Sequence, residues 1–277
     1  MTDKYAVIGN PVAHSKSPQI HKMFAEQTGQ DISYEAILAP LDGFAATVAR
    51  LRNEGFKGCN VTVPFKQEAW NLCLPTTRAL DAQAANTLKF DAERIIGDNT
   101  DGIGLVNDIE KNLKISLKDK RILLIGAGGA ARGVLHPLLE STQSPLVMKV
   151  IYNRTLEKAV SLKKTVEQHA EFRTFIIRAV EFGNLGNEQF DIVINATSAG
   201  LTDSEIPLPP NIFAPGALAY DMMYGRETPF MKFARVHGAA VVADGLGMLV
   251  EQAAEAFFIW RGVRPVTAPV IAALRQA

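Results

Sequence analysis

A glycine-rich turn between a buried apolar run and an amphipathic stretch constrains the fold of this chain more than any other segment. Residues 121–125 predict a strand, and residues 132–140 predict a helix. Between them, Gly126, Gly128 and Ala131 fit the spacing G-x-G-x-x-G/A. The first glycine permits a tight turn, the second lets a pyrophosphate approach the backbone, and the small third residue lets the helix pack on the strand. The segment therefore predicts a dinucleotide site; a turn that serves only chain reversal is the alternative.

Short apolar runs alternate with amphipathic stretches along the chain, which is typical of βαβ units with a mostly parallel sheet. The 277 residues leave room for about two domains, with a natural boundary near residue 102. Strands are expected at residues 4–8, 33–37, 58–63, 87–90, 94–97, 121–125, 149–152, 172–177, 191–196, 217–221 and 239–242. Helices are expected from residue 18 and at 44–53, 66–72, 102–111, 132–140, 156–169, 229–237 and 248–261. Residues 204–216 hold four prolines and predict an irregular loop.

Charge and cysteine content exclude several classes of protein. Lys plus Arg and Asp plus Glu both number 29, so a nucleic-acid binder that depends on a strong positive field is not expected. Cys59 and Cys73 form no CxxC or Cys/His cluster, so neither a metal site nor a disulfide framework is expected. The apolar stretch at 239–250 is too short and interrupted to span a bilayer. With no signal peptide recognised, a cytoplasmic protein is expected.

The end of the strand at 149–152 bears on the choice of cofactor. NAD sites usually carry Asp or Glu there, which accepts from the ribose 2′-hydroxyl, whereas this chain has Asn153-Arg154-Thr155. A carboxylate would repel a 2′-phosphate, and a guanidinium can bind it. Because a charged hydrogen bond contributes about 1.5–3 kcal/mol, we expect roughly a 10- to 100-fold preference for NADP over NAD. A surface arginine beside Thr155 as helix N-cap is the alternative.

Three polar clusters stand out in the first half of the chain. The first is S-K-S-P at 15–18, where Ser17 as N-cap and Pro18 make an ordinary helix start that also suits a carboxylate ligand. The second is N-V-T-V-P-F-K at 60–66, which ends with Lys66 at the start of a predicted helix. From this motif alone, the simpler interpretation of Lys66 is an exposed structural lysine. The third is N-T-L at 86–88 with D-N-T-D-G at 98–102, for which turn formation is the plain account.

Together with G-A-G-G-A-A-R-G, N-R-T, N-A-T-S-A-G, T-P-F and G-M-L-V-E-Q-A, these clusters resemble the shikimate dehydrogenase family in order and spacing over nearly the whole chain. The resemblance implies reversible, NADP-dependent reduction of 3-dehydroshikimate to shikimate, a step of the chorismate pathway to aromatic amino acids. It implies that residues 1–101 form the substrate domain, completed by C-terminal helices at 245–277. Residues 102–244 would form a Rossmann-type NADP-binding domain, with the active site in a cleft between the two.

The resemblance also implies roles for individual residues. Lys66 and Asp101 are the expected catalytic pair. The expected substrate-binding residues are Ser15, Ser17 and Tyr224 around the carboxylate, and Thr62, Lys66, Asn86, Asp101 and Gln252 around the ring hydroxyls. The expected NADP(H)-binding residues are Gly126, Ala127, Gly128, Gly129 and Ala130 at the pyrophosphate, Asn153, Arg154, Thr155 and Lys158 at the 2′-phosphate, Met222, Gly245 and Met248 near the nicotinamide, and Thr197.

The sequence departs from the family pattern in a few places and leaves alternatives open. Thr77 replaces a frequent acidic residue, Gln83 and Ala85 replace Gly and Val, and Gly225-Arg226 replaces Asn-Pro. A quinate/shikimate dehydrogenase with broader substrate or NAD use is the nearest alternative. A non-catalytic ligand sensor is the alternative from another class. Such a protein could lose Lys66 or Asp101 without penalty, whereas this chain has both. No membrane or nucleic-acid partner is expected, and both a monomer and a homodimer remain open.

Overall fold

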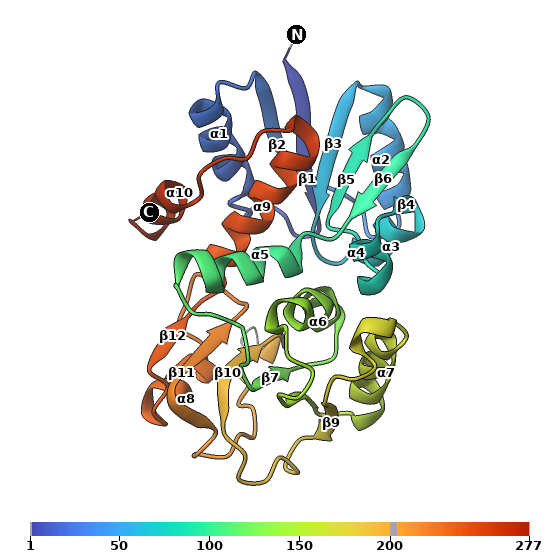
Figure 1. Cartoon of the computed structure of the whole chain (residues 1–277). Coiled ribbons are helices and arrows are strands. Elements are labelled where there is room, and N and C mark those ends of the chain that lie inside the picture. The colour runs from blue at the N-terminus through green and yellow to red at the C-terminus, as the bar shows by residue number, and fades with distance from the viewer. Residues whose placement is uncertain (1, 200–203, 277) are drawn as a thin grey trace. The chain divides into compact units, whose positions relative to one another are not determined.

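The computed structural model describes residues 2–199 and 204–276. The chain forms two compact units, Met1–Gly104 with Leu249–Ala277, and Leu105–Met248. The boundaries expected from the sequence, after residue 101 and before residue 245, lie within a few residues of these limits. Each unit has its own sheet (Figure 1).

The first unit is built on a six-stranded sheet in the order β2-β1-β3-β5-β6-β4. Its strands are β1 (Asp3–Gly9), β2 (Ile32–Leu38), β3 (Phe56–Val61), β4 (Leu74–Pro75), β5 (Thr87–Phe90) and β6 (Ile95–Asp98). The pairs β1–β2, β1–β3 and β4–β6 are parallel, whereas β5 runs antiparallel to β3 and β6. Because β5 begins where β3 and β6 end, Thr87 stands opposite both Asn60 and Asp98. Polar residues of three strands therefore meet at one end of the sheet.

Helices from both ends of the chain belong to this unit, wholly or in part. They are α1 (Ser17–Thr28), α2 (Phe44–Asn53), α3 (Lys66–Asn71), α4 (Thr77–Ala82), α5 (Asp101–Asn107), α9 (Leu246–Arg261) and α10 (Ala268–Gln276). Trp260 fastens α9 to the sheet: its ring stacks on Tyr5 with centroids 4.6 Å apart, and its Nε1–H donates to the Leu88 carbonyl at 3.0 Å. A Cβ on Gly58 would lie 2.6 Å from Trp260 Nε1, so the glycine lets the indole pack against β3. This packing explains why the C-terminal helices belong to the first unit.

The second unit has an all-parallel sheet in the order β12-β11-β10-β7-β8-β9. Its strands are β7 (Ile122–Ile125), β8 (Lys149–Asn153), β9 (Ile177–Glu181), β10 (Phe190–Asn195), β11 (Phe213–Asp221) and β12 (Val241–Ala243). Its α-helices are α6 (Gly129–Thr142), α7 (Leu156–Glu167) and α8 (Pro229–Val236). Counted from β7, the strand order is 3-2-1-4-5-6, which is the order of the Rossmann fold. The expectation of an α/β protein with a Rossmann-type unit is confirmed.

One predicted segment of the second unit is wrong, and a second one was predicted too long. Residues 172–177 do not form a strand, because Ala170–Phe172 is a short 3₁₀ helix and β9 begins only at Ile177. The side chain of Phe172 is buried in the hydrophobic core, which gives this turn the apolar character of a strand.

The irregular loop expected at 204–216 is confirmed for residues 204–212 but ends there, since β11 begins at Phe213. Proline is confined to strand edges and bulges. The pairing of β10 with β11 shifts its register after Phe190, and Gly216 has a φ of 80°. This irregularity lets the strand contain Pro215.

Two helix starts also differ from expectation. The N-cap of α1 is Lys16 rather than Ser17, which is already helical. The helix expected at 102–111 begins at Asp101 and gives way to a π-helical turn at Asp108–Asn112. Among the described residues, no helix is long and apolar enough to cross a membrane.

Candidate functional site

Two helix starts bring a lysine and a carboxylate together in the first unit. Lys66 is the first residue of α3, and Asp101 is the first residue of α5. The Nζ of Lys66 donates to Asp101 Oδ2 at 2.6 Å, and the two side chains are 32% and 10% exposed. An ion pair this short and mostly buried holds both groups in place, because either charge would be costly alone. The pair can therefore hold a proton at a fixed position.

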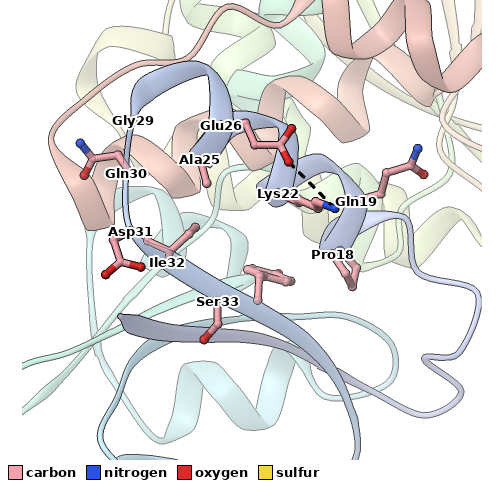
Figure 2. Close-up of a pocket in the computed structure, with 11 residues that line it drawn as sticks. Pro18, Gln19, Lys22, Ala25, Glu26, Gly29, Gln30, Asp31, Ile32 and Ser33 are labelled. Carbon is pink, nitrogen blue, oxygen red and sulfur yellow. Dashed lines mark ion pairs between the residues drawn. The ribbon is translucent and has the colours of Figure 1, made fainter. Parts of the chain in front are cut away.

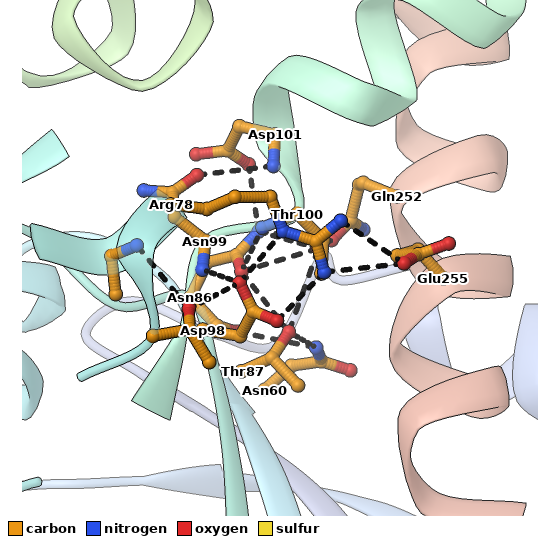
Figure 3. Close-up of polar contacts among 12 residues, drawn as sticks. Asn60, Arg78, Asn86, Thr87, Asp98, Asn99, Thr100, Asp101, Gln252 and Glu255 are labelled. Atoms are coloured by element: carbon orange, nitrogen blue, oxygen red, sulfur yellow. Dashed lines mark hydrogen bonds and ion pairs between the residues drawn. The ribbon is translucent and has the colours of Figure 1, made fainter. Parts of the chain in front are cut away.

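Asn86 joins this ion pair to a wider polar network (Figure 3). Its Nδ2 donates to Asp101 Oδ1 at 2.9 Å, Thr100 Oγ1 at 3.0 Å and Gln252 Oε1 at 3.2 Å. Its Oδ1 accepts the backbone N–H of Thr100 at 2.9 Å. Gln252 comes from α9 and also accepts from Thr100 Oγ1 at 3.2 Å. Four predicted site residues, Lys66, Asn86, Asp101 and Gln252, thus lie in one network.

Asn60 and Thr87 continue the network into the sheet. Asn60 Nδ2 donates to the Asn86 carbonyl at 3.2 Å and to Thr87 Oγ1 at 3.1 Å. The Oδ1 of Asn60 accepts from the Tyr34 hydroxyl at 2.7 Å. Asn60 is buried, and sequence reasoning assigned it no role although it opens one of the conspicuous motifs. Its side chain therefore helps to hold Asn86 in position.

Ser15 and Thr62 lie on the loops that follow β1 and β3, and Ser17 is the first residue of α1. Ser15 Oγ accepts the backbone N–H of Ser17 at 3.3 Å, so Ser15 lies just before the first turn of α1 and Ser17 within it. Thr62 lies against Gly9, where a Cβ would come 2.4 Å from Thr62 Cγ2. The missing side chain at Gly9 lets these two loops approach each other. Tyr224 belongs to the second unit, and burial raises the pKa of its hydroxyl.

The glycine turn of the second unit has the conformation that its spacing predicts. Gly126 has a φ of 110°, and a Cβ there would lie 3.1 Å from the Ala196 carbonyl oxygen. Gly128 is the N-cap of α6, which begins at Gly129. A Cβ on Gly128 or Gly129 would have no atom within 4 Å among the described residues, so the backbone is open to a bulky anion. This geometry fits the pyrophosphate of a dinucleotide at a helix N-terminus.

Other predicted cofactor residues surround this turn. Thr197 follows β10, and its Cγ2 would lie 3.2 Å from a Cβ on Gly126. Asn153 ends β8 and donates from Nδ2 to the Thr155 carbonyl at 2.8 Å. Arg154, Thr155 and Lys158 are exposed at the start of α7, with Thr155 as N-cap. Because neighbouring parallel strands end at the same edge, Asn153 and the glycine turn share one edge of the sheet.

Met222, Gly245 and Met248 also come together in the second unit. A Cβ on Gly245 would lie 2.2 Å from the Met222 carbonyl oxygen, and the Gly245 N–H donates to the Met223 carbonyl at 2.8 Å. Met248 is buried in the same core cluster against which Met222 packs. Glycine at 245 is therefore required for the two chain segments to touch.

The first unit also has a groove, but it is not lined by the residues described above. It measures about 790 Å³ and lies along α1 and β2, with the Lys22–Glu26 ion pair at 3.9 Å on its wall (Figure 2). Its lining residues run from Pro18 to Tyr34 and include no predicted site residue. The candidate site is therefore the polar network rather than this groove.

Sequence reasoning missed Arg78 and Glu255, which adjoin the network. Arg78 lies on α4, a six-residue helix that the apolar pattern does not reveal. Glu255 lies on α9, three residues after Gln252, and is 5% exposed. Glu255 could have been found from the sequence, because it is an acidic residue in an apolar helix, one turn from a predicted site residue.

The fold and the two sites define a class before any comparison is made: a two-unit α/β oxidoreductase with a dinucleotide-binding Rossmann unit. Three family models match the chain. They are the shikimate dehydrogenase substrate binding domain at residues 7–88, shikimate / quinate 5-dehydrogenase at 108–202, and the shikimate 5'-dehydrogenase C-terminal domain at 245–275.

Whole-chain relatives give the same result. A shikimate dehydrogenase (NADP(+)) of Methylobacillus flagellatus is 59% identical over 99% of this chain and 100% of its own length. The crystal structure of an Ael1 enzyme from Pseudomonas putida is 48% identical, with a TM-score of 0.90 over 99% of this chain and 98% of that one. A shikimate 5-dehydrogenase of Thermus thermophilus in complex with NADP(H) and shikimate is 32% identical, with a TM-score of 0.84 over 99% of both chains. The chain belongs to the shikimate dehydrogenase family.

Proposed function

We propose that this chain catalyses the reversible, NADPH-dependent reduction of 3-dehydroshikimate to shikimate in the synthesis of aromatic amino acids. The observation that carries the proposal is the Lys66–Asp101 pair, 2.6 Å apart and joined through Asn86 to Gln252. Relatives with up to 59% identity over the whole chain bear the name of this activity. Four of the motif positions that match the family, Lys66, Asn86, Asp101 and Gln252, lie in this network.

In the reductive direction, Lys66 would give a proton to the carbonyl oxygen of the substrate, and NADPH, when bound, would supply the hydride to the carbonyl carbon, so that a hydroxyl and NADP⁺ are the products. In the oxidative direction, Lys66 takes the hydroxyl proton as the ring carbon loses its hydride. Asp101 would hold the lysine Nζ in place through the 2.6 Å ion pair. Positioned proton transfer of this kind contributes roughly 10²–10⁴-fold to rate.

The substrate would be held by side chains of the first unit. Ser15 and Ser17 would bind the carboxylate at the first turn of α1, where free backbone N–H groups also favour an anion. The residues proposed to bind the ring hydroxyls are Thr62, Lys66, Asn86, Asp101 and Gln252. We also propose Tyr224 as a residue that binds the carboxylate. Oriented binding of this kind places the reacting hydroxyl at Lys66.

The cofactor would be held mainly by backbone. The open N–H groups at Gly126–Ala130 would bind the pyrophosphate, and Arg154, with Asn153, Thr155 and Lys158 around it, would bind the 2′-phosphate. Thr197 would border the pyrophosphate, and Met222, Gly245 and Met248 the nicotinamide. NADP supplies the hydride acceptor or donor when it is bound.

Further properties belong to the same proposal. Residues 1–101 and 245–277 would serve the substrate and residues 102–244 the cofactor. A cytoplasmic location accords with the free thiols of Cys59 and Cys73. The protein would act as a monomer or a homodimer, without nucleic-acid or membrane partners.

The proposal is tested by mixing the purified protein with shikimate or quinate, each with NADP⁺ or NAD⁺, and following the absorbance of reduced nicotinamide. Dominant turnover with shikimate and NADP⁺ is expected. Comparable turnover with quinate or NAD⁺ would assign the chain to the broader quinate/shikimate activity. Silence of folded protein in all four mixtures would overturn the proposal in favour of a ligand sensor.

A further inference from the structure

An array of two carboxylates and two guanidinium groups adjoins the catalytic pair in the first unit. Arg78 donates from Nε and Nη2 to the two carboxylate oxygens of Asp98 at 2.9 and 2.7 Å (Figure 3). Its Nη1 and Nη2 also donate to Glu255 Oε1 at 3.1 and 3.2 Å. Arg264 donates to the other oxygen of Glu255 at 2.6 Å. The array is therefore balanced in charge, with Arg78 in contact with both carboxylates.

Both carboxylates depend on this pairing. Asp98 and Glu255 are 6% and 5% exposed, and a buried carboxylate is costly unless it is paired and hydrogen-bonded. Burial by itself opposes the charge of Arg78, but hydrogen bonds and charge from Asp98 and Glu255 outweigh it and raise the pKa of the guanidinium. Without Arg78, Asp98 would lose its bidentate partner and Glu255 would keep only Arg264, so the two carboxylates that share Arg78 Nη2 would repel each other with less charge to balance them.

The two ends of the array carry two different parts of the candidate site. Asp98 Oδ1 accepts the backbone N–H of Asn99 at 2.7 Å, at the start of the segment that leads to Asp101. Glu255 lies on α9 three residues after Gln252, so the two side chains share one face of the helix. Arg78 thus ties the segment that bears Asp101 to the helix that bears Gln252.

We propose that Arg78 is a positioning residue that sets the place of Gln252 relative to Asp101 and thereby the recognition of the substrate's ring hydroxyls. The inference rests on the proposed function. Gln252 Oε1 accepts from Asn86 and Thr100 at 3.2 Å each, which is the long end of a hydrogen bond. A small displacement of α9 would break both bonds. Repulsion between Asp98 and Glu255 in the absence of Arg78 would produce such a displacement.

The first test is the kinetics of Arg78→Ala and Arg78→Lys with shikimate and NADP⁺. We expect Arg78→Ala to raise KM for shikimate about tenfold with a smaller change in kcat and none in KM for NADP⁺. Lysine cannot bind Asp98 bidentately and reach Glu255 at the same time, so Arg78→Lys should restore only part of the affinity. Arg121→Ala is the matched control, because it breaks a bidentate pair with Asp191 in the second unit. That control should lower Tm without raising KM for shikimate.

A double-mutant cycle with Gln252→Ala separates positioning from general destabilisation. If Arg78 acts through Gln252, Arg78→Ala should raise KM for shikimate by no more than about twofold in the Gln252→Ala background. A tenfold effect in both backgrounds, or an unchanged KM in Arg78→Ala, would overturn the inference. Should Arg78→Ala fail to fold, Glu255→Ala removes the acceptor at the α9 end and with it the link between Arg78 and α9. It should raise KM several-fold, and an unchanged KM would again overturn the inference.

The wild-type arm of the same experiment separates the inference from the proposed function. If the wild-type protein oxidises shikimate and the cycle is additive, only the role of Arg78 is refuted. If the folded wild-type protein does not turn shikimate over, the proposed function is refuted and the inference with it.

Discussion

The two units build their sites from different materials. In the first unit, side chains from β3, β5, α3, α5 and α9 hold one another through a continuous set of hydrogen bonds that includes the Lys66–Asp101 pair. In the second unit, the proposed site is a bare backbone turn at Gly128 and Gly129 with exposed side chains beside it. Side-chain networks distinguish small polar ligands by the pattern of their hydroxyls. Open N–H groups bind any phosphate of suitable shape.

The difference predicts that substitutions in the first unit change substrate kinetics and that substitutions in the second change cofactor kinetics. The largest effect should follow Lys66→Ala, because the proton of the reacting hydroxyl then loses its acceptor. We expect kcat for shikimate oxidation to fall roughly 10²–10⁴-fold, with KM for NADP⁺ unchanged. Lys57→Ala, which alters an exposed lysine of β3, is the control. Undiminished turnover in Lys66→Ala would remove this lysine from the chemistry.

Arg154→Ala should have the next largest effect and should be confined to the cofactor. Loss of a charged hydrogen bond to the 2′-phosphate should raise KM for NADP⁺ roughly 10- to 100-fold. KM for NAD⁺ should not change, because NAD⁺ has no 2′-phosphate. Arg173→Ala, another exposed arginine of the same unit, provides the comparison in steady-state assays with both cofactors. Equal KM values for NADP⁺ in wild type and Arg154→Ala would place the 2′-phosphate elsewhere.

Ser15→Ala should have a smaller effect, on the substrate alone. The hydroxyl is one of several donors at the start of α1, so its removal should raise KM for shikimate by about tenfold, or about 1.4 kcal/mol. Ser33→Ala, on the exposed edge strand β2, is the control. If KM for shikimate does not respond to Ser15→Ala, the carboxylate is bound at another place.

The smallest effect at neutral pH should follow His21→Phe, which probes the polar interior of the first unit. His21 is fully buried and stacks on Tyr34 with centroids 4.1 Å apart. Burial, which the nearby Asn60 only partly opposes, lowers its pKa to about 3. The unfolded chain, with a histidine pKa near 6.5, therefore binds the proton more readily than the folded protein does.

Neutral His21 makes its full contribution to the free energy of unfolding above about pH 6.5. As the pH falls towards 3, the free energy of unfolding decreases by up to about 1.4 kcal/mol per pH unit. Phenylalanine keeps the ring and removes the titration, so Tm of His21→Phe should fall less steeply than that of wild type between pH 6.5 and 4. Thermal unfolding at several pH values measures this, with the exposed His14→Phe as control. Parallel Tm curves for His21→Phe and wild type would contradict the predicted linkage.

The same contrast explains what the sequence could predict. The glycine turn is a local signal, so Gly126, Gly128 and the exposed Arg154 could be interpreted from neighbouring residues alone. The substrate side needs contacts between residues far apart in the chain, such as Lys66 with Asp101 and Asn86 with Gln252. No local pattern contains those contacts, and only the family resemblance pointed to them.

Most strands and helices could be predicted from apolar periodicity, and the misses have physical causes. Phe172 gives a 3₁₀ turn the apolar character of a strand, and a bulge at Gly216 admits a proline into β11. Helix α4 is too short to show a period, which is why Arg78 had no predicted context. Its partners Asp98 and Glu255 lie 20 and 177 residues away in the sequence.

The central claim is that side chains of the first unit bind the substrate and that the glycine turn of the second unit binds the cofactor. The most direct test is a crystal structure with shikimate and NADPH, which are both reduced and so cannot react with each other. We predict shikimate hydroxyls within hydrogen-bond distance of Lys66 and Asp101, and the pyrophosphate on the N–H groups at Gly128 and Gly129. Shikimate bound away from the Lys66–Asp101 pair, or a pyrophosphate away from this turn, would contradict the account.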